Sequence, residues 1–352
     1  TVDEGFIVGG PVGDFELLLC HGTVCVVGKI RDLILQLSKS SIYSTKPTLC
    51  QQMLHFSRGV IKSSMTLVLG SCHIARLHCL MRNFFTLIWK EPMTTLSRHP
   101  AFLSLQGGIN FRDLGGQRTA DGRRVRAGKL FRSGSLHMMT ADDLTHLDAI
   151  PLSRVIDYRD PGEVNRSPDK LNEAARYLNA PANPHVRDVN AKVTELNAAT
   201  LNALNGEQFM LELYRQLPFN NAAYRQLAGW LMEPFDGALL QHCAVGKDRT
   251  GVGCALTLFA LGCDRHTVME EYLLTQGMLT QVEDFLLESL GNELTARGRQ
   301  NLAEMMTVHE SYLAAALSGI DERYASVDAW LEKEYQLTPQ AREALQARLL
   351  EG

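Results

Sequence analysis

One stretch in the last third of the chain decides the fold: His242-Cys243-Ala244-Val245-Gly246-Lys247-Asp248-Arg249-Thr250-Gly251. The residues before it, Ala238 to Gln241, predict a short buried strand, and the apolar residues 252–261 after it predict a helix. A strand, a tight loop and a helix N-terminus in this order make an anion site, because unpaired backbone N–H groups and the helix dipole converge on the loop.

The spacing of Cys243 and Arg249, with five residues between them, indicates a loop that attacks and holds a phosphate group. We interpret Cys243 as the nucleophile. A thiol attacks only as thiolate, so such a loop must lower the pKa of its cysteine well below the value of about 8.5 of a free cysteine. Arg249 supplies positive charge and a planar fork that can bind two phosphate oxygens. A bare Cys-x5-Arg pattern arises by chance, whereas the full string with its strand and helix context is far more specific.

The remaining positions of the string also have expected roles. Six residues are expected to bind the substrate phosphate: Ala244, Val245, Gly246, Lys247, Thr250 and Gly251. The two glycines allow turn conformations and a close approach of the backbone to the ligand. Thr250 can donate its hydroxyl to the cysteine sulfur, and His242 is expected to orient the loop without acting as acid or base. Lys247 either binds a second phosphate, as on a phosphoinositide, or is solvated and only raises the local potential.

The ten-residue string resembles the phosphate loop of the bacterial atypical tyrosine and lipid phosphatases, within the cysteine phosphatase superfamily. Further similar stretches are the signature Gly107–Gly116, the strand and turn Leu130–Leu136, the segment Val155–Arg159 with Glu163, and the closing helices Tyr324–Leu350. The resemblance covers about residues 100–351. Tyr158 stands where the family has Leu, a departure that we expect to be tolerated.

The resemblance also implies which residue is the general acid. The chain contains no Trp-Pro-Asp sequence, and in the atypical family the acid is the Asp inside the loop, which maps onto Asp248. Its position beside Arg249 places it within reach of a leaving-group oxygen, although a neighbouring guanidinium favours the ionised carboxylate. Asp188 is the alternative, because it lies in a loop that can cover the site.

Bulk composition restricts the class of protein. A net charge of −4 over 352 residues offers no basic stripe for nucleic acid. No apolar run reaches the roughly 18 residues of a membrane span. Eight cysteines, one of them a predicted reactive thiolate, fit a reducing compartment better than a disulfide scaffold. We therefore expect a cytoplasmic location, with a secreted effector as the alternative. Cys254 and Cys263 are predicted core residues. The sequence indicates no oligomeric state.

The first 92 residues differ from the rest. They hold five of the eight cysteines and more basic than acidic residues, without a recognised motif or a signal peptide. Cys72-His73 and His78-Cys79 match no zinc spacing. We expect residues 1–92 to be an extension rather than a folded domain, with Met93 as the natural start of a single domain, residues 93–352. The alternative is a regulatory or membrane-touching arm.

Beyond residue 100, strands alternate with helices, which predicts an α/β fold with a mostly parallel central sheet flanked by helices. The predicted strands are Lys129–Arg132, Arg154–Tyr158, Arg176–Asn179 and Ala238–His242, and Thr140 begins a helix with a capping box. After the loop helix we expect a helical region: Asp264–Gln276, Val282–Leu290, Leu302–Leu317, Val327–Tyr335 and Pro339–Leu350. The resemblance implies that part of residues 277–352, about 277–309, forms a lid, while ordinary packing over the sheet is the alternative.

These features predict a phosphomonoester hydrolase that works through a phosphocysteine intermediate, without metal or cofactor. Its expected partners are phosphorylated proteins, with phosphotyrosine favoured, or phosphorylated lipids. One alternative is a catalytically silent phosphate-binding module, which is disfavoured because Cys243, Asp248, Arg249 and Thr250 are all present. A sulfur-transfer enzyme of the rhodanese type is disfavoured by the Arg-Thr pair and by His242.

Overall fold

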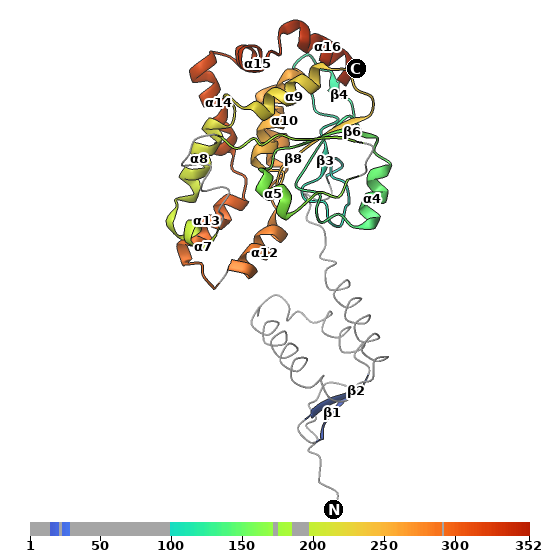
Figure 1. The fold of residues 1–352 in the computed structure, drawn as a ribbon, viewed down its shortest axis with the longest axis vertical. Helices are drawn as coiled ribbons and strands as arrows, with labels where there is room; N and C mark the ends of the chain where they lie inside the picture. The colour runs from blue at the N-terminus through green and yellow to red at the C-terminus, as the bar shows by residue number, and fades with distance from the viewer. Residues whose placement is uncertain (1–14, 21–22, 29–98, 172–174, 185–196, 291) are drawn as a thin grey trace, which may run out of the picture. The chain divides into compact units, whose positions relative to one another are not determined.

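The computed structural model describes residues 15–20, 23–28, 99–171, 175–184, 197–290 and 292–352 (Figure 1). The chain divides into two units, residues 1–91 and 92–352. In the first unit, the described strands β1 (Phe15–Cys20) and β2 (Thr23–Gly28) pair antiparallel, a hairpin that the sequence did not predict. Most of the extension, Met93 and Asp188 lie outside the described residues, so the predictions made for them stay predictions.

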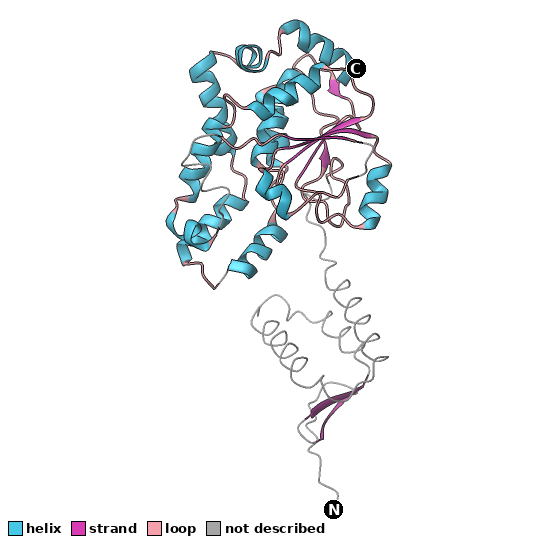
Figure 2. Ribbon diagram, viewed as in Figure 1, coloured by secondary structure: helices cyan, strands magenta, loops and turns pink. Residues whose placement is uncertain are grey.

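The second unit is built on a five-stranded sheet with the order β3-β5-β8-β6-β7 (Figure 2). Its strands are β3 (Arg112–Asp113), β5 (Leu130–Ser133), β6 (Leu152–Asp157), β7 (Arg176–Asn179) and β8 (Ala238–His242). The four strands from β5 to β7 run parallel, and β3 pairs antiparallel at the edge. The predicted fold class is therefore confirmed, and β7 and β8 have the predicted bounds.

The central strand β8 is buried along its whole length, as expected for a parallel strand covered on both faces. Its side chains alternate between two cores. Leu239 belongs to the larger core with Ile156, whereas Leu240 belongs to the smaller core with Val155. Figure 1 shows α4 (Ala141–Asp148) on one side of the sheet and α9 (Ala222–Met232) and α10 (Asp248–Ala260) on the other.

The capping box predicted at Thr140 is present. Thr140 accepts a hydrogen bond from the Asp143 backbone, and the Asp143 carboxylate accepts one from the Thr140 backbone. The other described helices are α5 (Pro161–Arg166), α7 (Ala198–Ala203), α8 (Gly206–Gln216), α11 (Arg265–Leu273), α12 (Thr280–Leu290), α13 (Ala296–Met306), α14 (Glu310–Tyr324), α15 (Val327–Tyr335) and α16 (Pro339–Leu349). Among the described residues, none of these helices combines the length and apolar composition needed to cross a membrane.

The predicted single helix Leu302–Leu317 is wrong. The chain leaves α13 at Thr307, whose backbone is extended (ψ 155°), and enters α14 after His309, whose backbone is also extended. Apolar periodicity runs across this break and does not reveal it. The last carbonyl groups of a helix need partners from outside the helix, and here a lysine ammonium binds two carbonyl groups at the break, those of Met305 and Thr307.

The C-terminus closes on the N-terminal part of the second unit. β9 (Leu350–Glu351) pairs antiparallel with β4 (Arg124–Val125), two residues on each side. Arg126 also donates from its backbone to Leu349 and from Nε to the Leu350 carbonyl. These contacts bring α16 to the end of the sheet where the parallel strands begin. The phosphate loop lies at the opposite end, where β8 finishes.

Candidate active site

The loop Cys243–Lys247 connects the carboxyl end of β8 to the first residue of α10, as the sequence predicts. Gly246 adopts a positive φ of 68°, a conformation that favours glycine. A Cβ atom there would lie 2.4 Å from the Ser133 carbonyl oxygen, so the neighbouring strand leaves no room for a side chain. The sequence motif therefore reflects both a turn and a close approach of two backbones.

The two residues that define the motif are both buried, Cys243 in this loop and Arg249 in the first turn of α10. Cys243 is 1% exposed and Arg249 is 7% exposed. The Arg249 guanidinium pairs with both carboxylate oxygens of Glu163, at 2.6 and 3.0 Å. Burial alone would raise the pKa of Glu163, but Arg249 outweighs it and holds that pKa below its ordinary value. In the sequence, Glu163 was noticed only through the family resemblance, and the structure shows that it orients Arg249.

Asp248, the predicted general acid, is held by a chain of hydroxyl groups. Its Oδ1 accepts a hydrogen bond from Tyr214 at 2.8 Å, and the hydroxyls of Tyr214 and Tyr272 lie 2.7 Å apart. Burial, together with the nearby Asp248 carboxylate, raises the pKa of both phenols, so they remain protonated donors. The Asp248 side chain stays 19% exposed. One oxygen is thus fixed, while the side chain keeps contact with solvent.

Lys247 occupies a place that neither sequence interpretation expects. Its side chain is fully buried, which rules out a solvated lysine. The ammonium donates to the carbonyl oxygens of Met305 at 2.6 Å and Thr307 at 2.9 Å, and lies 3.3 Å from Asp248 Oδ1. This contact joins the phosphate loop to the break between α13 and α14. The predicted role of Lys247 in binding substrate stays a prediction.

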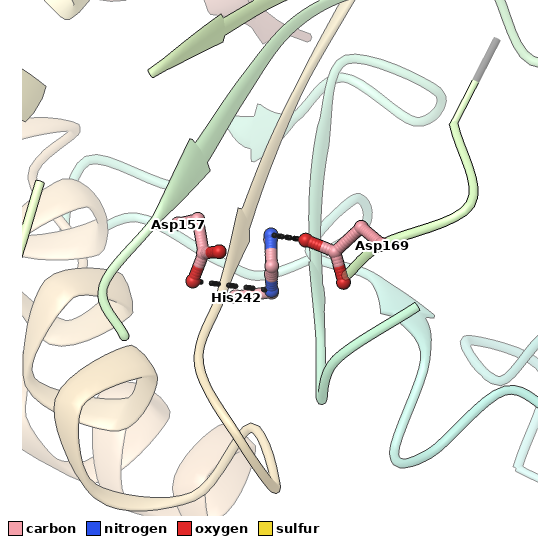
Figure 3. A group of neighbouring side chains, drawn as sticks. All are labelled: Asp157, Asp169 and His242. Carbon is pink, nitrogen blue, oxygen red and sulfur yellow. Dashed lines mark ion pairs between the residues drawn. The ribbon is translucent and has the colours of Figure 1, made fainter. Parts of the chain in front are cut away.

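His242 lies between two carboxylates (Figure 3). Its Nε2 is 3.3 Å from Asp169 Oδ2 and its Nδ1 is 3.8 Å from Asp157 Oδ1. We call Asp157, Arg159, Asp169 and His242 the His242 cluster. The two carboxylates and the imidazole lie close enough to hold a metal ion. However, Arg159 Nη2 already pairs with Asp157 at 2.7 Å and with Asp169 at 2.6 Å, so a cation occupies this position.

Within the His242 cluster, burial alone would raise the pKa of Asp157, but His242 and Arg159 outweigh it and hold that pKa below its ordinary value. Tyr177 donates a further hydrogen bond to the same carboxylate. The cluster also contacts backbone near the loop, because Asp169 accepts a hydrogen bond from the Leu136 backbone. The predicted role of His242 as a residue that orients the loop stays a prediction.

The other predicted loop residues are also located. Ala244 accepts a hydrogen bond from the Ser135 backbone through its carbonyl group, and Val245 belongs to the same loop. Gly251 is buried against the Tyr272 ring. Thr250 Oγ1 is buried without a hydrogen-bond partner in the part of the chain that the structure describes, so the predicted bond to the cysteine sulfur is not formed here.

The side chains around the loop explain two further observations from the sequence. Cys254 and Cys263 are buried in the larger core, which confirms the prediction made for them. Tyr158 is buried and donates to Gln241 at 2.9 Å. A Cβ atom on Gly253 would lie 2.8 Å from the Tyr158 hydroxyl, so a glycine in α10 makes room for this departure from the family pattern.

The fold and the loop together define a phosphatase with a cysteine in its phosphate-binding loop. The sequence pattern of the tyrosine phosphatase family matches residues 103–351. The chain is 32% identical over 259 residues to a candidate tyrosine-protein phosphatase of Cupriavidus necator, an alignment that covers 69% of this chain and 92% of that protein. It is 30% identical over 261 residues to the triple specificity protein phosphatase PtpB of Mycobacterium tuberculosis, covering 66% and 93%.

The chain therefore belongs to the tyrosine phosphatase family, which confirms the resemblance and the enzyme class predicted from the sequence. Among solved structures, P. aeruginosa TpbA shows a TM-score of 0.23 and 16% identity, covering 55% of this chain and 90% of that chain. A likeness this low carries no argument about the site.

Proposed function

We propose that this phosphatase hydrolyses phosphomonoesters, phosphotyrosine foremost, in two steps through a phosphocysteine. The observation that carries the proposal is the loop itself, which places Cys243 and Arg249 together at the N-terminus of α10. Loop N–H groups and the helix dipole favour an anion at this position. The Nε–H of Arg249 makes no hydrogen bond within the described residues and is a donor for a substrate oxygen.

In the first step, the Cys243 thiolate attacks phosphorus, the phosphorus–oxygen bond to the alcohol or phenol breaks, and Asp248 gives its proton to the leaving oxygen. In the second step, water attacks phosphorus, Asp248 takes a proton from that water, and the sulfur–phosphorus bond breaks to release phosphate and the thiolate. Tyr214 fixes Asp248 Oδ1, so the transferred proton is carried on Oδ2.

The position of Lys247 supports phosphotyrosine over phosphoinositides. Recognition of a second phosphate on an inositol ring needs a cation with free donors at the mouth of the site. The Lys247 ammonium is buried and donates to two backbone carbonyls instead. The relative PtpB is named a triple specificity protein phosphatase, which supports phosphorylated proteins as the substrate class.

Phosphate release tests the proposal, with wild type and Cys243→Ser compared without added metal. The substrates are phosphotyrosine and phosphoserine peptides and a set of phosphoinositides. We expect release by wild type alone, fastest from phosphotyrosine. Phosphate binding without turnover would instead support a silent binding module, and faster release from phosphoinositides would refute the substrate assignment.

A separate comparison identifies the acid. With a substrate that has a poor leaving group, Asp248→Asn should abolish most turnover, and Asp188→Asn should not. The reverse result would transfer the role to Asp188, which lies outside the described residues.

A further inference from the structure

A buried cluster of two arginines and one glutamate lies behind the phosphate loop. Arg112 of β3 donates from Nε to Glu271 Oε1 at 2.7 Å, and Arg132 of β5 pairs with Glu271 Oε2 at 2.6 Å. Both arginine side chains are 0% exposed, and Glu271, on α11, is 2% exposed. With two cations and one anion, this cluster encloses one excess positive charge. We call it the Arg112–Glu271–Arg132 cluster.

The Arg112–Glu271–Arg132 cluster contacts the loop directly. Arg132 Nη2 donates to the carbonyl oxygen of Gly246 at 2.6 Å, and Asn110 Nδ2 donates to the same oxygen at 2.9 Å. Two donors on one carbonyl fix the orientation of that peptide unit. The loop is thereby held from behind by a charged side chain and a neutral one.

The other ion pairs around the loop carry no such excess. Arg249 pairs with Glu163, and Lys247 pairs with Asp248. The His242 cluster has one guanidinium for two carboxylates, so it is neutral when the imidazole is protonated and negative otherwise. Asp160 adds a further negative charge near Arg249. Among the described ion pairs at the loop, positive charge is in excess only behind Gly246.

The excess charge persists near neutral pH. Burial and the neighbouring Arg132 lower the pKa of Arg112 to about 10, so it is still protonated. Burial also disfavours the charge of Arg132, but attraction by Glu271 outweighs it and keeps the pKa of Arg132 above its ordinary value. Burial raises the pKa of Cys254, the other thiol near this cluster, to about 12. Cys254 therefore stays neutral and supplies no counter-charge.

In the described part of the chain, two tyrosines that face Cys243 are also neutral. Burial raises the pKa of Tyr158, on the loop after β6, and of Tyr224, on α9, well above the ordinary value of a phenol. An enclosed charge without a counter-ion is costly. A thiolate at Cys243 would supply that counter-ion, because it lies in the loop that Arg132 contacts through the Gly246 carbonyl.

We propose that the Arg112–Glu271–Arg132 cluster supplies the excess positive charge that stabilises the Cys243 thiolate and the bound phosphate, with Arg132 as the positioning residue that reaches the loop. The inference rests on the proposed role of Cys243 as the nucleophile. It assigns two functions to this cluster, an electrostatic one through its net charge and a geometric one through the Gly246 carbonyl.

The test follows thiolate formation directly by ultraviolet absorbance, as the difference between each protein and the same protein carrying Cys243→Ser. Arg132→Gln removes the excess charge and should move the midpoint of thiolate formation up by about one pH unit. Glu271→Gln removes the negative charge of the cluster, which raises its net positive charge, and should move the midpoint down by about one unit. A purely structural disturbance would move both variants in the same direction.

Asn110→Ala is the matched control, because it removes the other hydrogen bond to the Gly246 carbonyl without changing any charge. Its midpoint should equal that of wild type, as should that of Arg132→Lys, which keeps the charge. The direction of the midpoint shift is predicted separately for Arg132→Gln and for Glu271→Gln, so the proposal can be tested even if only one of these variants folds. An unchanged midpoint in Arg132→Gln or Glu271→Gln, or a shift of one unit in Arg132→Lys, would overturn the proposal. Absorbance reports ionisation without turnover, so this result is independent of the substrate assays.

Discussion

Replacing Lys247 with methionine tests the unexpected position of this side chain. The substitution leaves the carbonyl groups of Met305 and Thr307 without their donor and removes the cation beside Asp248. Each buried carbonyl left unpaired costs about 1–3 kcal/mol. Methionine recovers part of this, because it fills the same space and needs no desolvation of a charge. We expect the free energy of unfolding to fall by about 3 kcal/mol.

The assay is urea unfolding of the full chain, followed by circular dichroism, with thermal unfolding in parallel. A domain of this size loses roughly 2–4 °C per kcal/mol, so the unfolding temperature should fall by about 6–12 °C. Lys333→Met, at an exposed position on α15, is the control and should change stability by less than about 0.5 kcal/mol. A loss below about 1 kcal/mol for Lys247→Met would refute the reasoning, because it would mean that the two carbonyls are satisfied without the lysine.

Three further outcomes are expected. Tyr214→Phe removes the hydroxyl that holds the proposed acid, so kcat should fall about tenfold for an aryl phosphate with a poor leaving group and little for one with a good leaving group. Glu163→Gln should raise KM about tenfold by releasing Arg249. Because the pKa of Glu163 is lowered by folding, wild type should be more stable than this variant at pH 7, an advantage lost as the pH falls below 4.5. Gly253→Ala should destabilise the protein by about 1–3 kcal/mol through contact with Gln241 Oε1 and the Tyr158 hydroxyl, and Tyr158→Leu should relieve the part that comes from Tyr158.

Each of these has a result that contradicts it. Equal losses of kcat for both leaving groups would separate Tyr214 from proton transfer. A stability difference for Glu163→Gln that persists at low pH would show that the carboxylate charge is not its source. Additive effects of Gly253→Ala and Tyr158→Leu in a double-mutant cycle would show that the two side chains do not meet.

The sequence predicted the elements of the fold where pattern and burial coincide. β8 is apolar and fully buried, and its bounds agree with the prediction. The Thr140 cap is a local contact between residues three apart, so its signal lies in the sequence itself. The break between α13 and α14 was missed because it depends on a lysine about 60 residues earlier, and periodicity carries no information about such a partner.

The candidate site was predicted unevenly for the same reason. Cys243, Asp248 and Arg249 lie within seven consecutive residues of the loop and the first turn of α10, so their spacing in the sequence brings them together. Glu271 was missed because it lies in a helix whose pattern indicates ordinary packing, while its arginine partners come from two distant strands. The sequence signal that could have revealed Glu271 is a charged residue on the helix face that is predicted to pack against the core, since such a residue needs a buried partner.

The bond between Lys247 and the end of α13 also orders events during synthesis. Chains emerge from the ribosome N-terminus first, at about 5–20 residues per second. The strands that hold the phosphate loop precede Met305 and Thr307, so the loop is made before the carbonyl groups that anchor its lysine. The Lys247 ammonium is therefore synthesised several seconds before the two carbonyl groups that it binds. A nascent chain thus carries Cys243, the proposed nucleophile, in an unfinished loop, and the proposed site is completed only when the C-terminal helices dock.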